Sequence, residues 1–441
     1  MSLHRRQFLS LLASTSTAAM TASHAADSTS PDMPHVPWSR QAAIYQVNVR
    51  QYTADGTFKA AMADLPRLKD MGVDILWLMP IQPIGKLNRK GTLGSYYSIS
   101  DYTAVNPEFG TLADVRAFVQ AAHAQGMKVI LDWVANHTAF DHPWTREHKD
   151  WYKLDAHGDI FAVTFNAGAP NEEHWSDVTA LDYDRPALRD AMIAAMRFWV
   201  REVDLDGFRC DVASLVPTPF WERARRELDE VKPMFMLAES DAPDLHRGAF
   251  DMTYGWDLVR VFQAIGKGKA GAAELRDWAA KEPHGYPPPA YRMRFTSNHD
   301  INSWDGTDAE LYGPAYQPLA VLSFTLPGMP LIYGGQEARL DKRLEFFEKD
   351  PIAWKTRELQ PFYTKLLALK HQHPALANGQ YGGALALLDV GNDKLFAFTR
   401  TKDADHVAVA VVVNVTTVEQ KFKLAGSERT LPASGWIVEA A

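Results

Sequence analysis

The sequence has one cysteine, no excess of basic residues and no apolar run suited to a membrane anchor. Cys210 alone cannot form an intramolecular disulfide, so the fold must depend on its core. The chain carries 46 Lys and Arg against 54 Asp and Glu, a net charge of −8, which argues against a nucleic-acid-binding protein with a basic face. The apolar stretch 11–20 is too short and too rich in Ser and Thr to anchor the chain in a bilayer.

The N-terminus carries a targeting pattern. Residues 5–9 have the sequence RRQFL, a twin-arginine motif, and the modest apolar stretch 11–20 follows. Residues 23–25 (SHA) supply the small side chains that a signal peptidase needs, so we expect a signal peptide over 1–25, cleaved after Ala25. The alternative is a plain disordered tail. The pattern predicts export of the folded protein by the twin-arginine machinery and a periplasmic or secreted mature chain.

The order of apolar segments indicates an α/β protein. The 441 residues suit a barrel of eight β/α units with insertions. From residue 42 onward, strand-like runs alternate with amphipathic runs such as 112–125, 185–203 and 220–231, the pattern of a parallel sheet. The sequence therefore predicts a (β/α)8 TIM barrel. The expected strands, of which the sixth is short and polar, are 43–50, 75–80, 128–133, 207–213, 234–239, 251–254, 292–297 and 330–333.

Two regions interrupt or follow this alternation. After the third strand comes an aromatic, histidine-rich insertion with no clean period. A helix expected over 359–373 stops at Pro374, and short strand-like runs with turn residues between them follow, which indicates a separate all-β domain, a β-sandwich. The expected strands there are 384–390, 394–399, 407–414, 419–424 and 436–439. The predicted boundaries are 26–137 and 184–378 for the two parts of the barrel, 138–183 for the insertion and 379–441 for the β-domain.

Four segments place polar and acidic residues at the ends of strand-like runs. Because the C-terminal ends of all strands of such a barrel share one rim, carboxylates far apart in sequence can converge there. Most glycosidases cleave a glycosidic bond with two catalytic carboxyl groups that flank it. The segments are Asp132-Trp133-Val134-Ala135-Asn136-His137, Gly207-Phe208-Arg209-Cys210-Asp211, Leu237-Ala238-Glu239-Ser240 and Phe295-Thr296-Ser297-Asn298-His299-Asp300.

Taken in order, these segments resemble the signature regions of the α-amylase family, also called glycoside hydrolase family 13. The resemblance extends over roughly residues 40–440. It implies a TIM barrel with a short domain B after the third strand and a C-terminal β-domain. It also implies a retaining α-glycosidase that cleaves α-1,4-glucosidic bonds of starch-type glucans or maltooligosaccharides, with no cofactor in the chemistry.

The resemblance assigns roles to three carboxylates. Asp211 matches the nucleophile, and Arg209, two residues earlier on the same strand, faces the same way and holds it ionised; an ordinary Arg–Asp ion pair is the alternative for this motif. Glu239 matches the acid/base, and the apolar run before it is expected to raise its pKa. Asp300 matches the third family carboxylate, which grips sugar hydroxyls.

Further side chains match sugar-binding positions. His137 and His299 match the two family histidines that bind the sugar at the cleavage subsite. Tyr97 resembles the tyrosine that stacks on the same sugar, with Tyr96 as the alternative, because an aromatic face suits the apolar face of a pyranose ring. Asp132 corresponds to a structural support below the site.

The residues near the expected barrel rim leave two alternatives for a structural metal ion. Asn136 matches a family calcium ligand, and Asp177 in the insertion is a candidate second ligand. However, Ala180 stands where the family's domain-B motif has an aspartate. The lysine and histidine that the family often carries just beyond the nucleophile are missing after Asp211. A structural calcium ion and a metal-free fold are both compatible with these residues.

Two alternatives to hydrolysis follow from the same motifs. Transglycosylation or isomerisation of small α-glucosides would use the same covalent intermediate, because water and sugar compete for it. A non-catalytic sugar-binding barrel is the alternative from another class, and it would be expected to lack a member of the carboxylate set, whereas this chain has all three.

Overall fold

Eight parallel strands form a closed barrel in the computed structural model, which describes residues 35–165, 172–402 and 409–440. The order around the barrel is β1-β11-β10-β9-β8-β7-β3-β2, and each of the eight expected segments supplies one strand. The strands are Ile44–Val47 (β1), Ile75–Leu78 (β2), Lys128–Trp133 (β3), Gly207–Cys210 (β7), Phe235–Ala238 (β8), Met252–Tyr254 (β9), Tyr291–Arg294 (β10) and Met329–Tyr333 (β11). The predicted TIM barrel is confirmed, whereas the predicted signal peptide lies outside the described residues.

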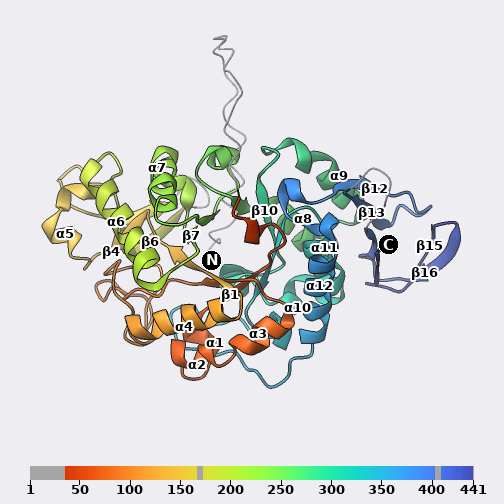
Figure 1. Ribbon diagram of the computed structural model, residues 1–441, viewed down its shortest axis with the longest axis horizontal. Helices are drawn as coiled ribbons and strands as arrows, with labels where there is room; N and C mark the ends of the chain where they lie inside the picture. Colours follow the sequence, from red (N-terminus) through yellow and green to blue (C-terminus); the bar gives the residue numbers. More distant parts are fainter. Residues whose placement is uncertain (1–34, 166–171, 403–408, 441) are drawn as a thin grey trace, which may run out of the picture.

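Helices surround the barrel (Figure 1), and amphipathic ones such as α6 (Pro186–Val203) bury one apolar face. In α6, Met192, Met196 and Trp199 recur at helical spacing on the buried side, and the helix ends where Asp204 takes a left-handed conformation with φ 62°. The helices are α1 (Val49–Tyr52), α2 (Phe58–Met62), α3 (Leu65–Met71), α4 (Leu112–Ala124), α5 (Trp144–Glu147), α6 (Pro186–Val203), α7 (Thr218–Asp229), α8 (Trp256–Gly266), α9 (Ala272–Lys281), α10 (Asp308–Tyr312), α11 (Tyr316–Thr325) and α12 (Gln360–Gln372). None of the helices in the described part of the chain has the length and apolar character needed to cross a membrane.

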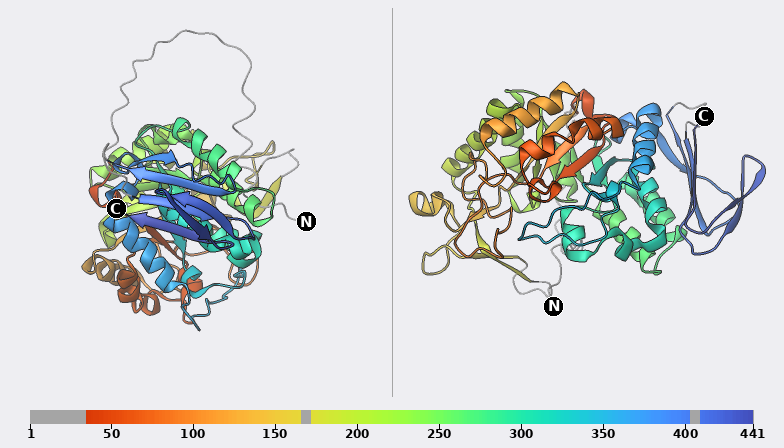
Figure 2. Two further views of the ribbon diagram at one scale, coloured as in Figure 1. Left: turned by 90° about the vertical axis from the view of Figure 1, so that its right-hand side faces the viewer. Right: turned by 90° about the horizontal axis from the view of Figure 1, so that it is seen from below.

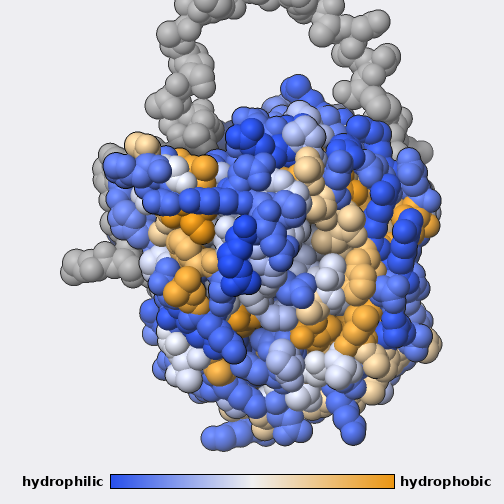
Figure 3. Space-filling view, turned by 90° about the vertical axis from the view of Figure 1, so that its left-hand side faces the viewer, coloured by the Kyte–Doolittle hydropathy of each residue, from blue (hydrophilic) through white to orange (hydrophobic). Residues whose placement is uncertain are grey.

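The insertion after β3 has regular structure that its sequence did not reveal. Strands β4 (His137–Ala139), β6 (Glu173–Ala180) and β5 (Ala162–Phe165) form an antiparallel sheet in that order. The insertion lies at one end of the molecule, opposite the C-terminal strands (Figure 1). Figure 3 shows the face at this end, where apolar side chains gather in patches between polar ones. Two large apolar side chains of the insertion, Leu154 and Phe161, are exposed.

The C-terminal region consists of two small antiparallel sheets, as the predicted all-β domain requires (Figure 2). The larger contains β12 (Ala384–Leu387), β13 (Leu395–Thr401), β14 (Val409–Asn414) and β17 (Trp436–Ala440), and the smaller pairs β15 (Gln420–Leu424) with β16 (Ser427–Leu431). Strand β16 was not predicted, because its sequence SERTL is largely polar and exposed.

The larger C-terminal sheet packs on the barrel through one of its faces. Phe396 and Phe398 belong to the same buried core as the barrel, whereas Leu395 and Ala397, on the opposite face of β13, pack in a second core with the β15–β16 pair. The buried Arg400 guanidinium on β13 donates to the carbonyl of Thr325 at the end of α11 (2.8 Å).

Candidate active site

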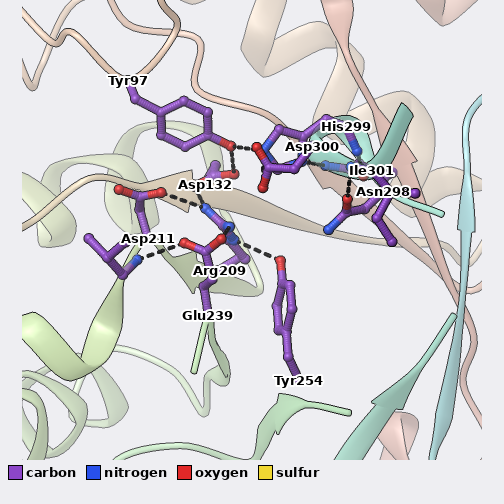
Figure 4. Close-up of polar contacts among 12 residues, drawn as sticks. Tyr97, Asp132, Arg209, Asp211, Glu239, Tyr254, Asn298, His299, Asp300 and Ile301 are labelled. Carbon is purple, nitrogen blue, oxygen red and sulfur yellow. Dashed lines mark hydrogen bonds and ion pairs between the residues drawn. The ribbon is translucent and has the colours of Figure 1, made fainter. Parts of the chain in front are cut away.

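The buried guanidinium of Arg209 lies at the centre of the candidate site (Figure 4). Its Nη1 lies 2.8 Å from Asp132 Oδ1 and 3.1 Å from Asp211 Oδ1, and its Nη2 lies 2.9 Å from Glu239 Oε1. Its Nε donates to the hydroxyl of Tyr254 (3.1 Å). One cation therefore contacts three buried carboxylates.

The barrel register explains why these residues meet. Strands β3, β7 and β8 are neighbours, and Asp132 pairs with Arg209 across the first two. Asp211 directly follows β7 and Glu239 directly follows β8, so both leave the barrel at the same rim. The predicted convergence of Arg209, Asp211 and Glu239 is thus present in the structure.

The turn after β7 contains a strained residue that the sequence did not reveal. Val212 has φ 38° and ψ 47°, a left-handed conformation that is rare for a β-branched residue. In this conformation its N–H donates to Glu239 Oε2 (2.8 Å). Strain of this kind clusters at functional sites, where surrounding contacts maintain it.

Glu239 lies in surroundings more polar than the apolar approach of β8 suggested. Its two oxygens contact the Arg209 guanidinium and the Val212 amide. The apolar residues of β8 lie below it in the barrel, so the carboxylate itself faces a charged rim. The apolar run before Glu239 thus describes the barrel interior below the carboxylate, and the partners of the carboxylate itself come from the neighbouring strand and its turn.

The opposite wall of the site contains Tyr97, His299 and Gln46. Gln46 accepts the backbone N–H of His299 at its Oε1 (3.2 Å), which leaves its Nε2 to donate to His299 Nδ1 (2.8 Å). His299 therefore carries its proton on Nε2, 2.7 Å from the Tyr97 oxygen, and Tyr97 in turn donates to Asp132 Oδ2 (3.1 Å). This chain of hydrogen bonds connects the wall to the Arg209 cluster. Gln46 had no motif to identify it.

Packing distinguishes Tyr97 from Tyr96, the alternative for the tyrosine that stacks on the sugar. The Tyr97 ring stacks on the His299 ring with centroids 5.6 Å apart, whereas the Tyr96 ring lies beneath the Arg50 guanidinium at 4.1 Å. Tyr97 is thus the tyrosine that the structure brings to the candidate site.

Asp300 reaches the site from a helical turn. Strand β10 ends at Arg294, and the chain runs on to His299 and Asp300, which begin a turn that continues as the π-helical segment Ile301–Asp305. Asp300 is buried, and its Oδ2 lies 3.5 Å from His299 Nε2. The expectation that Asp300 closes a strand is corrected by these positions, although the residue does lie beside the Tyr97–His299 wall (Figure 4).

His137 lies at the start of β4, just past the end of β3. It is buried, its ring meets that of Trp175 edge-on at 5.6 Å, and its Nδ1 lies 3.1 Å from Asn136 Nδ2. The structure therefore places it at the junction between the barrel rim and the insertion.

The two candidate calcium ligands have other partners. Asp177 Oδ1 lies 3.1 Å from Lys90 Nζ, and the Asn136 amide nitrogen contacts His137. Within the described residues, no three His, Cys, Asp or Glu side chains form a group that could hold a metal ion. A divalent ion at Asp177 would have to displace this ammonium group.

Burial and neighbouring charges shift the pKa values of Asp132 and Arg209 in opposite directions. Burial raises the pKa of Asp132 to about 7, although Arg209 lowers it. For Arg209, burial alone would lower the pKa, but the adjacent carboxylates of Asp132 and Glu239 raise it well above its usual range. Arg209 is therefore the permanent charge of the site. The pKa of Tyr97 is raised by burial and by Asp132, so this hydroxyl remains protonated.

Comparisons with known proteins agree with this geometry. The catalytic-domain family "Alpha amylase, catalytic domain" matches residues 46–253. A solved α-amylase from Lactobacillus plantarum is 32% identical, covers 91% of this chain and 99% of its own, and superposes with a TM-score of 0.78. The chain belongs to the α-amylase family, glycoside hydrolase family 13.

Relatives in this family differ in their named activities. The α-amylase MalA of Haloarcula japonica is 29% identical over 90% of this chain and 59% of its own length. The α-1,4-glucan:maltose-1-phosphate maltosyltransferase of Mycobacterium tuberculosis is 30% identical over 82% of this chain and 54% of its own length. The chain thus spans little more than half of the length of these two relatives. Because their named activities differ, membership of the family alone does not define the reaction of this chain.

Proposed function

We propose that this chain is a retaining α-glycosidase that cleaves α-1,4-glucosidic bonds of starch-type glucans or maltooligosaccharides. The observation that carries the proposal is the pair Asp211 and Glu239, which leave adjacent strands and contact the same guanidinium at 3.1 and 2.9 Å. Such proximity supports the carboxyl separation of about 5–5.5 Å that direct nucleophilic attack needs.

In the first step, an oxygen of Asp211 attacks the anomeric carbon while Glu239 gives its proton to the glycosidic oxygen. The bond between that oxygen and the anomeric carbon breaks, and a glycosyl ester of Asp211 forms. In the second step, Glu239 takes a proton from water, whose oxygen attacks the anomeric carbon and releases Asp211. Two inversions leave the product in the α-configuration.

The remaining residues would hold the sugar at the cleaved bond. Tyr97 would offer its aromatic ring, and His299 would share between the Tyr97 oxygen and a sugar hydroxyl the proton that it carries on Nε2. Asp300 would accept from sugar hydroxyls, and His137 would contact the same sugar from the insertion side. The Arg209 guanidinium lies 3.1 Å from Asp211 Oδ1 and holds this carboxylate in place for attack.

The test combines two variants with an anomer assay. Asp211→Asn should abolish turnover, and Glu239→Gln should block cleavage of natural linkages but spare the first step on α-glucosyl fluoride, whose leaving group needs little proton assistance. The exposed Glu202, which pairs with Arg116, provides the matched control Glu202→Gln, expected to be fully active. Proton NMR should show the α-anomer first, and a β-anomer appearing first would refute the roles of Asp211 and Glu239.

A second candidate is glycosyl transfer, which the maltosyltransferase relative favours. It would use the same ester of Asp211 with a sugar hydroxyl in place of water. Product profiles on maltoheptaose with and without an added acceptor sugar separate the two reactions, because a transferase gives longer products and a hydrolase only shorter ones. The twin-arginine motif adds the proposal that the enzyme acts in the periplasm or outside the cell.

A further inference from the structure

An ion pair joins the long loop after β2 (residues 79–111) to the insertion. The ammonium of Lys90 in this loop lies 3.1 Å from Asp177 Oδ1 on β6. The Asp177 side chain is 6% exposed and that of Lys90 is 33% exposed, so the cation reaches from the surface to a buried carboxylate. Burying a carboxylate is costly unless a cation accompanies it, so the position of Asp177 depends on Lys90.

Both partners of the Lys90–Asp177 pair belong to segments that carry candidate sugar-binding residues. The loop after β2 contributes Tyr97 to the Tyr97–His299 wall. Strand β6, which carries Asp177, pairs with β4, the strand that begins with His137. The ion pair therefore connects the two segments that would contact one sugar from different sides.

The neck of the loop is fixed to the insertion by backbone contacts. Ile84 and Ile99 pair across the neck, and the carbonyl of Ile99 accepts the N–H of Ala139 in β4 (2.8 Å). A Cβ at Gly85 would lie 2.3 Å from the Cβ of Ala139, so the two segments approach without room for a side chain. Lys90 lies between the two ends of this neck in the sequence, and its ammonium extends the attachment toward the tip of the loop.

The loop after β2 also supplies a second donor to Asp177. The Ser98 hydroxyl donates to the Asp177 backbone carbonyl (2.9 Å), while Lys90 pairs with Oδ1 of the same residue. Carboxylate and backbone carbonyl oxygens are the ligands that a calcium ion prefers. Two oxygens of the candidate calcium ligand are thus already bound by donors from this loop.

We propose that the Lys90 ammonium takes the place of a calcium ion as the cation that holds the insertion against the loop after β2. Lys90 is a positioning residue, because it acts through the segments that carry Tyr97 and His137 rather than on the reacting atoms. Its effect on substrate binding depends on the proposed function, whereas its effect on stability does not.

Loss of the ammonium should have two measurable consequences. The variant Lys90→Met leaves the Asp177 carboxylate buried without its cation, so the melting temperature should fall by roughly 3 °C or more. A less firmly held loop also lowers the fraction of enzyme in which Tyr97 and His137 both reach the sugar, and the apparent dissociation constant rises by the same factor. The KM for maltoheptaose should therefore rise about threefold or more, with kcat within about twofold.

Further variants separate the ion pair from a local packing effect. Lys90→Arg keeps a cation and should retain the wild-type melting temperature and KM. Lys86→Met removes an exposed cation from the same loop and should change neither. The double variant Lys90→Met/Asp177→Asn no longer buries a lone carboxylate, so it should lose less than the sum of the two single variants. It also provides a comparison if Lys90→Met alone does not fold.

Thermal melting and initial rates on maltoheptaose give both readouts. Millimolar calcium chloride should leave the wild-type melting temperature unchanged. A wild-type melting temperature that rises with calcium, additive losses in the double variant, or a folded Lys90→Met variant with unchanged KM would overturn the proposal. A wild-type enzyme that cleaves no maltooligosaccharide would instead refute the proposed function, and the melting temperatures would still test the role of Lys90.

Discussion

Replacement of Arg209 by methionine should destabilise the fold as well as end catalysis. The guanidinium is fully buried and lies within 2.8–3.1 Å of oxygens of Asp132, Asp211 and Glu239. Methionine has a similar length but no charge, so three carboxylates would remain buried without a cation. Breaking a buried ion pair by removing one partner costs about 3–5 kcal/mol, and we expect a loss of unfolding free energy in that range at pH 7.

The pH dependence of this loss follows from Asp132. In the wild type its pKa is raised to about 7, so the stability contributed by its protonated form is present below the unfolded value near 4 and is lost as the pH rises through about 7. Without the charge of Arg209 the pKa of Asp132 rises further, and the variant continues to lose stability above pH 7. The difference in unfolding free energy between the wild type and Arg209→Met should therefore increase by about 1.4 kcal/mol per pH unit above pH 7.

Urea unfolding followed by tryptophan fluorescence at pH 6, 7 and 8 measures this gap. The control Arg116→Met removes an exposed arginine paired with Glu202 and should cost less than about 1 kcal/mol with no change across this pH range. A gap for Arg209→Met below about 1 kcal/mol, or one that narrows from pH 6 to pH 8, would refute this account of the cluster.

Three further predictions concern other parts of the chain. Gln46→Glu should lower kcat/KM about tenfold, because a carboxylate cannot donate to His299 and the loss of one buried hydrogen bond costs about 1–3 kcal/mol; unchanged kinetics would contradict a His299 tautomer protonated on Nε2. Chelation with EDTA should lower the melting temperature or activity only slightly, because the Lys90 ammonium already neutralises Asp177, and a collapse rescued by calcium would show the opposite. Replacing both arginines of the 5–9 motif with lysine should leave the precursor in the cytoplasm, as cell fractionation would reveal, whereas normal export would exclude the twin-arginine route.

The parts of the fold that were predictable depend on local sequence. Apolar runs on strands buried on both faces identified the barrel strands other than the short, polar sixth, and the motifs at their ends identified the carboxylates that meet at Arg209. The strands of the insertion and β16 escaped prediction because short polar or aromatic strands lack a clear alternation. Asp300 was expected at a strand end, since sequence alone does not show that β10 stops at Arg294 and a helical turn follows.

The contacts that were not predictable join residues distant in sequence. Gln46 and His299 are 253 residues apart, and no local pattern around Gln46 suggests a role in orienting an imidazole. Lys90 beside Asp177 and the Val212 amide beside Glu239 likewise depend on how loops meet after folding. Such partners determine the proton positions and charges of the site. Motifs therefore identify the reacting groups but not the distant contacts that adjust their properties.

The attachment of the C-terminal sheet makes it part of the barrel's folding unit. Phe396 and Phe398 share the barrel core, and Arg400 caps a carbonyl at the end of α11. Cutting the chain before residue 379 would expose an apolar surface on the outside of the barrel and leave that carbonyl without its donor. The C-terminal strands are therefore not a removable module, and heat should unfold both regions in a single cooperative transition.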